Sequence, residues 1–248
     1  WHFGLRDAMN GKPITDDYGN IYIPGNDVVL TNDIGFSGDS IEIAPANGNA
    51  NRTLNGQGHM IANYSGGVYG WKDNASHPIF RIEQPGMNVT MANVTINGNK
   101  RGSTCDSIAI RNRDMHSGIN LSLNNVEICR SSGQGLFVDP DAKGIGVTVY
   151  IQNSNIHDNC LKYADSAGVT VYGYLDVSGS NIYNNAGNGV VVCPSPKIMT
   201  GWSSSFIMNG SKSYNNGGAG VYVLNATSYY QNSGIAYSKA AVKNSEFY

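Results

Sequence analysis

The 248-residue chain contains few charged residues, and their low number already excludes several classes of protein. Asp, Glu, Lys and Arg together make up 14% of the chain, against roughly 25% in an ordinary globular domain. Nucleic acids and anionic membrane surfaces are bound by concentrated basic patches. Since the formal net charge is −2, we expect neither as a partner.

The sequence also lacks a long apolar run and a motif for metal binding. No stretch approaches the ~20 consecutive apolar residues of a transmembrane helix, so we expect no membrane insertion by this segment. The four cysteines form no CxxC motif, and none of the five histidines lies four residues from another. We therefore expect neither a metal site nor another cofactor, and calcium in particular has no support in the sequence.

Glycine, asparagine and serine are abundant instead, and they mark the corners of an internal repeat. The three clearest copies read VYIQNSNIHDN (149–159), YLDVSGSNIYNNAGNGVVV (174–192) and SFIMNGSKSYNNGGAGVYV (205–223). When the copies are aligned, the residue at the first corner of each is Asn93, Asn125, Asn153, Gly179, Gly210 or Asn244. These corners are 32, 28, 26, 31 and 34 residues apart. A constant local pattern with a variable period is typical of the coils of a parallel β-helix.

We therefore predict an all-β fold, a right-handed parallel β-helix that forms one domain over residues 1–248, with regular coils from about residue 53 to the end. A short strand buries one face only when the next coil stacks on it at about 4.8 Å. Crossovers between parallel strands are almost always right-handed, which gives the expected hand. The residues predicted to point inward are Leu121, Leu123, Val149, Ile151, Leu175, Val177, Phe206 and Met208.

The corners predict a second stabilising feature. Gly and Asn tolerate positive φ, and Asn and Ser bond their own backbone, which suits them to tight corners. Stacked Asn side chains can also hydrogen-bond to each other along the axis. Asn93, Asn125 and Asn153 are the candidate ladder, which Gly179 and Gly210 interrupt.

The N-terminal segment is predicted to close one end of the β-helix. Residues 1–13 begin with apolar residues at helical spacing and reach Gly11-Lys12-Pro13, so we expect a short amphipathic helix that covers the exposed core. Strands are predicted at 27–31 and 40–43. The chain ends inside a repeat, and we expect the native protein to continue beyond Tyr248.

Two of the four cysteines are candidates for a disulfide. Cys129 and Cys160 follow the second apolar step of neighbouring coils, which makes them the closest pair in the repeat alignment. A disulfide would indicate an oxidising compartment. Free buried thiols are the alternative, because cysteine is among the most buried residue types.

Several segments resemble a known fold family. The segments LTNDI (30–34), LNGQGH (54–59) and VTING (94–98) are similar to the opening of pectin-lyase-like parallel β-helix proteins, most of all bacterial surface adhesins and autotransporter passengers. This resemblance implies the fold and a secreted or cell-surface location.

A second resemblance is to mannuronan C-5 epimerases. It rests on GQGLFVDPD (133–141) followed by IHDN (156–159). In that family an Asp-Pro-His-Glu/Asp motif carries catalysis, with a nearby Tyr and a basic residue. Asp139-Pro140 matches the motif, whereas Asp141 stands in place of the His and Ala142 in place of the acid. The resemblance implies Asp139 as a site residue, and the departures favour binding over catalysis.

Charged candidates for a site come from the same coils. Asp139 and Asp141 flank a proline at a strand end, and the basic clusters are Lys100-Arg101 and Arg111-Asn112-Arg113. An Asp-Pro turn and a solvated face are the alternatives. If the chain is an enzyme that removes a proton beside a carboxylate, it needs a base and a cation. The candidate catalytic residues are then Asp139, Asp141, His157 and Lys162.

Tyrosine is the stronger signal for binding, with 15 residues against six phenylalanines. A tyrosine presents an apolar ring and a hydroxyl, which suits sugars and protein hot spots. Outward strand positions also favour tyrosine, which is the simpler explanation. The candidate ligand-binding tyrosines on neighbouring coils are Tyr150, Tyr172, Tyr174 and Tyr183.

These observations favour an extracellular or cell-surface adhesin that recognises glycans, or a host-surface or extracellular-matrix protein, along a lateral face of the β-helix. The alternative is a polysaccharide lyase or mannuronan C-5 epimerase-like enzyme that acts on uronate polymers. A further alternative is a segment of a phage tailspike. The fold serves all three classes and therefore does not decide among them.

Overall fold

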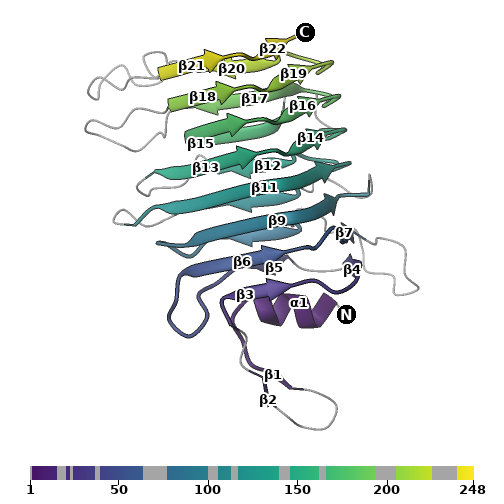
Figure 1. Ribbon diagram of the computed structural model, residues 1–248, viewed down its shortest axis with the longest axis vertical. Helices are drawn as coiled ribbons and strands as arrows, with labels where there is room; N and C mark the ends of the chain where they lie inside the picture. Colours follow the sequence, from purple (N-terminus) through teal and green to yellow (C-terminus); the bar gives the residue numbers. More distant parts are fainter. Residues whose placement is uncertain are drawn as a thin grey trace.

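The structure is a computed structural model that describes residues 2–15, 21–22, 25–36, 40–63, 77–99, 106–112, 117–139, 146–161, 166–193, 205–224 and 239–248. It is a parallel β-helix whose coils stack along one axis, as predicted (Figure 1). Among the described strands, only β1 (Ile14–Thr15) and β2 (Ile21–Tyr22) pair in antiparallel fashion. All other strand pairs are parallel, which is the pattern that stacked coils produce.

The strands form three lateral faces. Face 1 consists of β3 (Asp27–Val29), β6 (Asn51–Asn55), the first parts of β9 (Asn88–Asn97) and β11 (Ile119–Cys129), β13 (Val147–Gln152), the second part of β15 (Ala167–Ser178), β18 (Ser205–Asn209) and β21 (Lys239–Lys243). Face 2 consists of β4 (Ile34–Phe36), β7 (Met60–Asn63), the second parts of β9 and β11, β14 (Asn155–His157), β16 (Asn181–Tyr183), β19 (Lys212–Tyr214) and β22 (Glu246–Phe247). Face 3 consists of β5 (Ile41–Glu42), β8 (Phe80–Ile82), β10 (Ile108–Ile110), β12 (Leu136–Val138), the first part of β15, β17 (Asn188–Cys193) and β20 (Val221–Val223).

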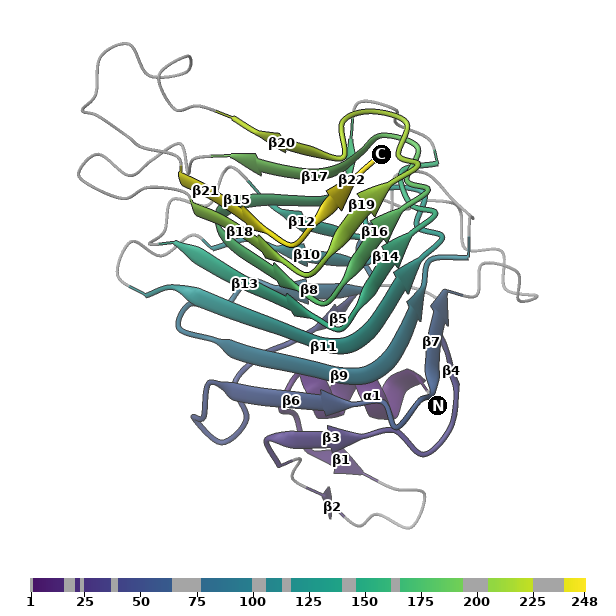
Figure 2. The same ribbon diagram turned by 45° about the horizontal axis from the view of Figure 1, so that its top comes forward.

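The corner between faces 1 and 2 lies where the repeat alignment predicts it. The long strands β9 and β11 bend there, as Figure 2 shows, at Asn93 (φ 52°) and Asn125 (φ 54°). The other aligned corners also have positive φ, and they are Asn153, Gly179, Gly210 and Asn244. Gly and Asn adopt this region more readily than most other residues, which explains the composition of the corners.

The core is the set of apolar side chains that the coils stack inside the three faces. Leu121, Val149, Leu175 and Phe206 lie in one parallel register and are at most 1% exposed. A second buried column lies two positions further along each strand and consists of Leu123, Ile151, Val177 and Met208. All eight predicted inward residues are therefore confirmed.

The predicted asparagine ladder is correct in part. Asn125 Nδ2 donates to Asn93 Oδ1 at 2.9 Å, as expected, but Asn153 donates to Asn124 at 3.5 Å rather than to Asn125. A buried ladder that the sequence did not predict lies at the corner after face 2. There Asn159 Nδ2 donates to Asn185 Oδ1 at 3.1 Å, and Asn185 Nδ2 donates to Asn216 Oδ1 at 3.0 Å.

Helix α1 (His2–Met9) covers the first coil, as predicted for the N-terminal segment (Figure 1). Leu5 and Met9 join the core, with 5% and 0% of their surface exposed. Gly11 ends the helix with φ 67°, and a Cβ atom there would come within 2.5 Å of the Pro45 carbonyl oxygen. The guanidinium of Arg52 links the helix to the first coil, because it donates hydrogen bonds to the carbonyl oxygens of Ala8 in the helix and Gly25 before β3.

The parallel ladder begins one coil before residue 53. β3 pairs with β6, and β4 pairs with β7, so a coil already runs through residues 27–42. Strands were expected at 27–31 and 40–43, where β3 and β5 lie, whereas no strand was expected at β4. None of the described helices is long and apolar enough to cross a membrane.

Candidate functional site

Four aromatic rings form a row on the outside of face 2. The row contains His157, Tyr183, Tyr214 and Tyr248 on four successive coils. Neighbouring ring centroids are 4.7, 5.0 and 5.3 Å apart, with interplanar angles of 8°, 4° and 21°. Because the rings cover each other's faces, the row presents ring edges and hydroxyl groups to the solvent.

Strand alternation explains why these side chains point outward. Ile156 and Ile182 point into the core with no exposed surface, so the residues on either side of each point away from it. A second column of outward side chains lies two positions before the ring row on each strand. It contains Asn155 and Asn181, whose amide groups are hydrogen-bonded at 3.0 Å. Lys212 and Glu246 continue this column with an ion pair at 2.9 Å, and this hydrogen bond raises the pKa of Lys212.

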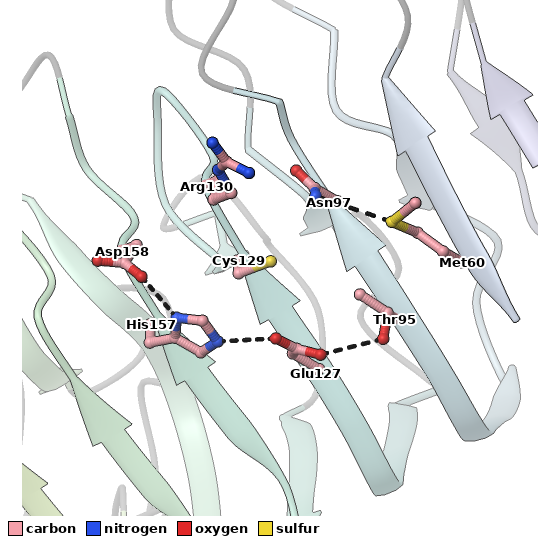
Figure 3. Close-up of a pocket in the computed structure, with 8 residues that line it drawn as sticks. All are labelled: Met60, Thr95, Asn97, Glu127, Cys129, Arg130, His157 and Asp158. Atoms are coloured by element: carbon pink, nitrogen blue, oxygen red, sulfur yellow. Dashed lines mark hydrogen bonds and ion pairs between the residues drawn. The ribbon is translucent and has the colours of Figure 1, made fainter. Parts of the chain in front are cut away.

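An open pocket of about 620 Å³ lies at the His157 end of the row (Figure 3). Its lining comes from β7, β9, β11 and β14 and from the corner residues that follow β11 and β14. The lining residues are Met60, Thr95, Asn97, Glu127, Cys129, Arg130, His157 and Asp158.

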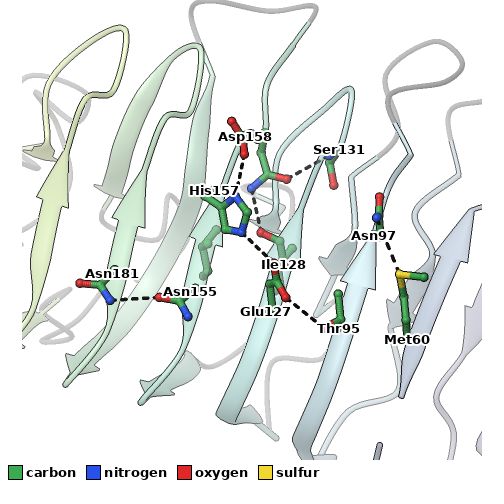
Figure 4. Close-up of polar contacts among 12 residues, drawn as sticks. Met60, Thr95, Asn97, Glu127, Ile128, Ser131, Asn155, His157, Asp158 and Asn181 are labelled. Atoms are coloured by element: carbon green, nitrogen blue, oxygen red, sulfur yellow. Dashed lines mark hydrogen bonds and ion pairs between the residues drawn. The ribbon is translucent and has the colours of Figure 1, made fainter. Parts of the chain in front are cut away.

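His157 is the centre of the polar network in this pocket. Its Nε2 lies 3.0 Å from Glu127 Oε1, and its Nδ1 lies 2.8 Å from Asp158 Oδ2 (Figure 4). The other oxygen of Glu127 accepts a hydrogen bond from the Thr95 hydroxyl at 3.1 Å. A protonated imidazole donates to both carboxylates, whereas a neutral ring keeps one nitrogen free to accept a proton or bind a ligand. The network therefore fixes the orientation of the ring.

Burial changes the acidity of two groups around the pocket. Cys129 is 4% exposed, and burial, followed by the charge of Glu127, raises the pKa of its thiol to about 12. Burial also raises the pKa of the Tyr183 hydroxyl, with Tyr214 and Glu127 as smaller causes. Both groups therefore stay neutral near pH 7 and do not serve as bases there.

Two of the predicted charged residues, Arg111 and Asp139, lie on face 3, away from this pocket. Arg111 Nε lies 2.5 Å from Asp139 Oδ2, and Asp139 is only 8% exposed. Arg111 also approaches Glu83 at 3.9 Å. The predicted carboxylate and the predicted cation thus neutralise each other, and neither lies on face 2. The predicted residues Lys100, Arg101, Arg113, Asp141 and Lys162 lie outside the described residues.

The four predicted tyrosines are distributed over all three faces. Tyr150 and Tyr174 lie on face 1, with ring centroids 5.8 Å apart. Tyr172 pairs with Cys193 on face 3, and Tyr183 belongs to the ring row on face 2. Tyr183 and His157 are therefore the predicted site residues that the fold brings together on face 2.

The candidate disulfide between Cys129 and Cys160 is not formed. Both residues, like Cys193, are buried free thiols, which was the alternative interpretation. In the parallel register Cys129 pairs with His157, so Cys160 lies three residues further on, beyond the corner at Asp158. Burial raises the pKa of the Cys160 thiol to about 11.

Several residues of the site were missed, although the repeat alignment contains the signal for them. Four residues after the corners at Asn153, Gly179, Gly210 and Asn244 come the four members of the ring row. Counting two and four residues after Asn125 gives Glu127 and Cys129. The column can thus be read from the sequence once the corners are aligned. The partners Thr95, Arg130 and Asp158 need the fold.

No family model matches the chain, and no curated protein matches it. Among solved structures, the chain is similar to the A-module of the mannuronan C-5 epimerase AlgE4 of Azotobacter vinelandii, with a TM-score of 0.51 and 14% sequence identity. The match covers 89% of this chain and 68% of the epimerase module. At this identity the likeness shows a shared parallel β-helix fold.

Proposed function

We propose that the chain binds an extended glycan along face 2, with the ring row as the binding strip and the pocket around His157 as its polar end. The observation that carries this proposal is the register of the row, which places one ring on each of four successive coils. The hydroxyls recur at the coil spacing of about 4.8 Å, close to the length of one sugar unit in an extended polysaccharide. A linear polymer can therefore meet the same contact on successive units.

The chemistry of the strip suits hydroxyl-rich ligands better than apolar ones. Stacked rings offer edges and hydroxyls, and the neighbouring column offers the amides of Asn155 and Asn181. Of the charged groups in the pocket, Arg130 is cationic and Glu127 and Asp158 are anionic, so the pocket has no strong excess of either sign. A secreted or cell-surface location remains a prediction from the sequence, as does a protein partner on a host surface.

A glycan array with the purified chain, followed by calorimetric titration of the best ligand, tests the proposal. Tyr183→Phe combined with Tyr214→Phe keeps the stacked rings and removes two hydroxyls. We expect this variant to weaken binding about 30-fold, because two hydrogen bonds of about 1 kcal/mol each are lost. Tyr222→Phe is the matched control, since Tyr222 is 50% exposed on face 3. Absence of binding across linear glycans, or equal losses in both variants, would contradict the proposal.

A second candidate function is lyase or epimerase chemistry on uronate polymers. The specific observation in its favour is His157 between two carboxylates, with Arg130 lining the same pocket. Removal of the C5 proton needs a base, and the developing charge beside the uronate carboxylate needs a cation. The solved structure with the similar fold is itself a mannuronan epimerase module.

Incubation with alginate and with pectate distinguishes catalysis from binding. Lyase activity produces absorbance from unsaturated chain ends, and epimerase activity produces exchange of the C5 proton with deuterium from the solvent. If either occurs, His157→Gln should abolish it and Asp139→Asn should leave it intact, because Asp139 lies on face 3. Turnover that depends on Asp139 and not on His157 would contradict this assignment of the site.

A further inference from the structure

Three potential metal ligands of different chemistry meet in the pocket on face 2. Glu127 and Cys129 lie on β11, and His157 lies on β14 of the next coil. One carboxylate oxygen, the thiol sulfur and one ring nitrogen all lie within 4.8 Å of one another. In the described part of the chain, this is the one place where three such groups gather.

The thiol is buried without a hydrogen-bond partner. Cys129 is 4% exposed and free, and no described residue bonds to its sulfur. It points outward on face 2 rather than into the core, since Ile128 before it occupies the core position. A cysteine kept for its apolar character would be expected on the inward side of the strand. Its place in a polar pocket is instead what a ligand requires.

The histidine and the glutamate have the outer-shell partners that metal ligands have. Asp158 accepts from His157 Nδ1 at 2.8 Å, which leaves Nε2 directed at Glu127 (Figure 3). A carboxylate on the far nitrogen orients a metal-bound histidine and raises its basicity. The Thr95 hydroxyl orients Glu127 by donating a hydrogen bond to its second oxygen. Both arrangements exist already, so only short movements are needed to bring the three ligands around an ion.

We propose that Glu127, Cys129 and His157 bind a divalent transition-metal ion, with zinc as the natural choice. The combination of thiolate, imidazole and carboxylate is the donor set of zinc, whereas calcium and magnesium take oxygen ligands alone. Three protein ligands leave a fourth position open. That position faces the pocket, where a water, a sugar hydroxyl or a uronate oxygen can reach it.

The inference stands independently of glycan binding, because the ligands and their partners are all in the chain itself. Metal binding requires an unprotonated His157 Nε2, and it releases the proton of the Cys129 thiol. No electron is transferred, and no further reactant is needed.

Titration of the full chain with Co²⁺ after treatment with a chelator tests the proposal directly. A thiolate ligand produces a sulfur-to-cobalt charge-transfer band in the near ultraviolet, and Cys129→Ser should abolish this band. Cys160→Ser and Cys193→Ser are the matched controls, because both remove a buried free thiol elsewhere and should keep the band. Absence of the band in the unaltered chain overturns the proposal. So does a band that survives Cys129→Ser or that disappears in Cys105→Ser instead.

Zinc retained after desalting, measured by mass spectrometry, gives a second readout. We expect one equivalent in the unaltered chain and none above background in His157→Gln. Asp158→Asn removes only the outer-shell partner, and it should weaken zinc binding roughly 10- to 100-fold while the cobalt band remains. Circular dichroism confirms that each variant is folded. Equal zinc retention in the unaltered chain and in His157→Gln overturns the proposal.

Discussion

The imidazole ring of His157 lies flat on the phenol ring of Tyr183, with the ring centroids 4.7 Å apart and an interplanar angle of 8°. This contact joins the polar pocket to the tyrosine row, because the same histidine also meets Glu127 and Asp158. The position of the imidazole is therefore determined from three sides. The roles that we propose for His157, as a base or as a metal ligand, depend on that restraint, and so does the continuity of the proposed binding strip.

The row itself should stabilise the C-terminal coils. Tyr214 is stacked on both sides, by Tyr183 and by Tyr248. Tyr214→Ala should lower the free energy of unfolding by about 2 kcal/mol, since two aromatic contacts are lost at roughly 1 kcal/mol each. Tyr214→Phe keeps both contacts and should change stability by less than about 0.5 kcal/mol. Urea unfolding followed by circular dichroism measures both variants. An equal loss in both would show that the hydroxyl, and not the stacking, is responsible.

The sequence predicts the fold in considerable detail because each corner imposes a local requirement. Asn or Gly at six aligned corners with positive φ, and apolar residues at fixed distances from them, define both the inward columns and the coil boundaries. The same alignment contains the ring row. The strand β4 (IGF) was missed because its central Gly35 is a weak strand former, and pairing with β7 of the next coil stabilises the strand.

The site was harder to predict because its partners come from different coils. Glu127 and His157 are 30 residues apart, and the loops between coils vary in length. The spacing of histidines in the sequence predicts no metal site, since it detects only ligands on one strand or helix. Arg111 and Asp139 were identified as separate site residues, but stacking brings them together as an ion pair. The stacking of the coils determines which charged groups pair with each other and which can bind a ligand. The sequence pattern does not show this pairing.

The buried asparagine ladder should contribute more to stability than the half-buried pair of Asn155 and Asn181 on face 2. Asn185 accepts from the side chain and the backbone N–H of Asn159, both at 3.1 Å, and donates to Asn216 at 3.0 Å. Asn185→Ala leaves these buried groups without partners and should lower the free energy of unfolding by about 3 kcal/mol. Asn181→Ala removes only the half-buried contact to Asn155 and should cost less than about 1 kcal/mol. Denaturant unfolding of the two variants checks this order, and a reversed order would contradict it.

Arg52 should be essential for attachment of the N-terminal cap. Its guanidinium is 1% exposed, donates to Gly25 O at 2.9 Å and also donates to Ala8 O at the end of α1. Burial lowers the pKa of Arg52, and the charge of Asp27 opposes this shift. Arg52→Ala leaves two carbonyl groups unpaired and creates a cavity, so we expect a loss of about 3 kcal/mol in unfolding experiments.

The matched control for Arg52 is Lys243→Ala, which removes an exposed positive charge from β21 and should change stability by less than about 0.5 kcal/mol. Arg52→Ala should also expose the core end of the first coil and promote association, which light scattering detects. A variant that remains monomeric and as stable as the control would show that α1 is held by Leu5 and Met9 alone.

Asp106 should make the stability of the protein depend on pH between about 4 and 6. Burial raises the pKa of its carboxyl group to about 6, although a hydrogen bond from the Gln134 N–H at 2.7 Å acts in the opposite direction. The folded state therefore binds the proton more tightly than the unfolded chain, whose value is 3.8. The stabilisation is complete below the unfolded pKa and is lost as the pH rises through about 6.

Asp106→Asn removes this dependence, because an amide does not titrate and its oxygen can still accept from Gln134. Relative to this variant, the unaltered protein should lose up to about 3 kcal/mol between pH 4 and pH 7. Asp33→Asn is the control, and the pH dependence of stability that it removes has the opposite sign. The hydrogen bond from the Met60 N–H lowers the pKa of Asp33, so this carboxylate stabilises the folded state more as the pH rises. Thermal unfolding at several pH values measures all three proteins. Parallel pH profiles for the unaltered chain and Asp106→Asn would mean that Asp106 does not titrate in this range.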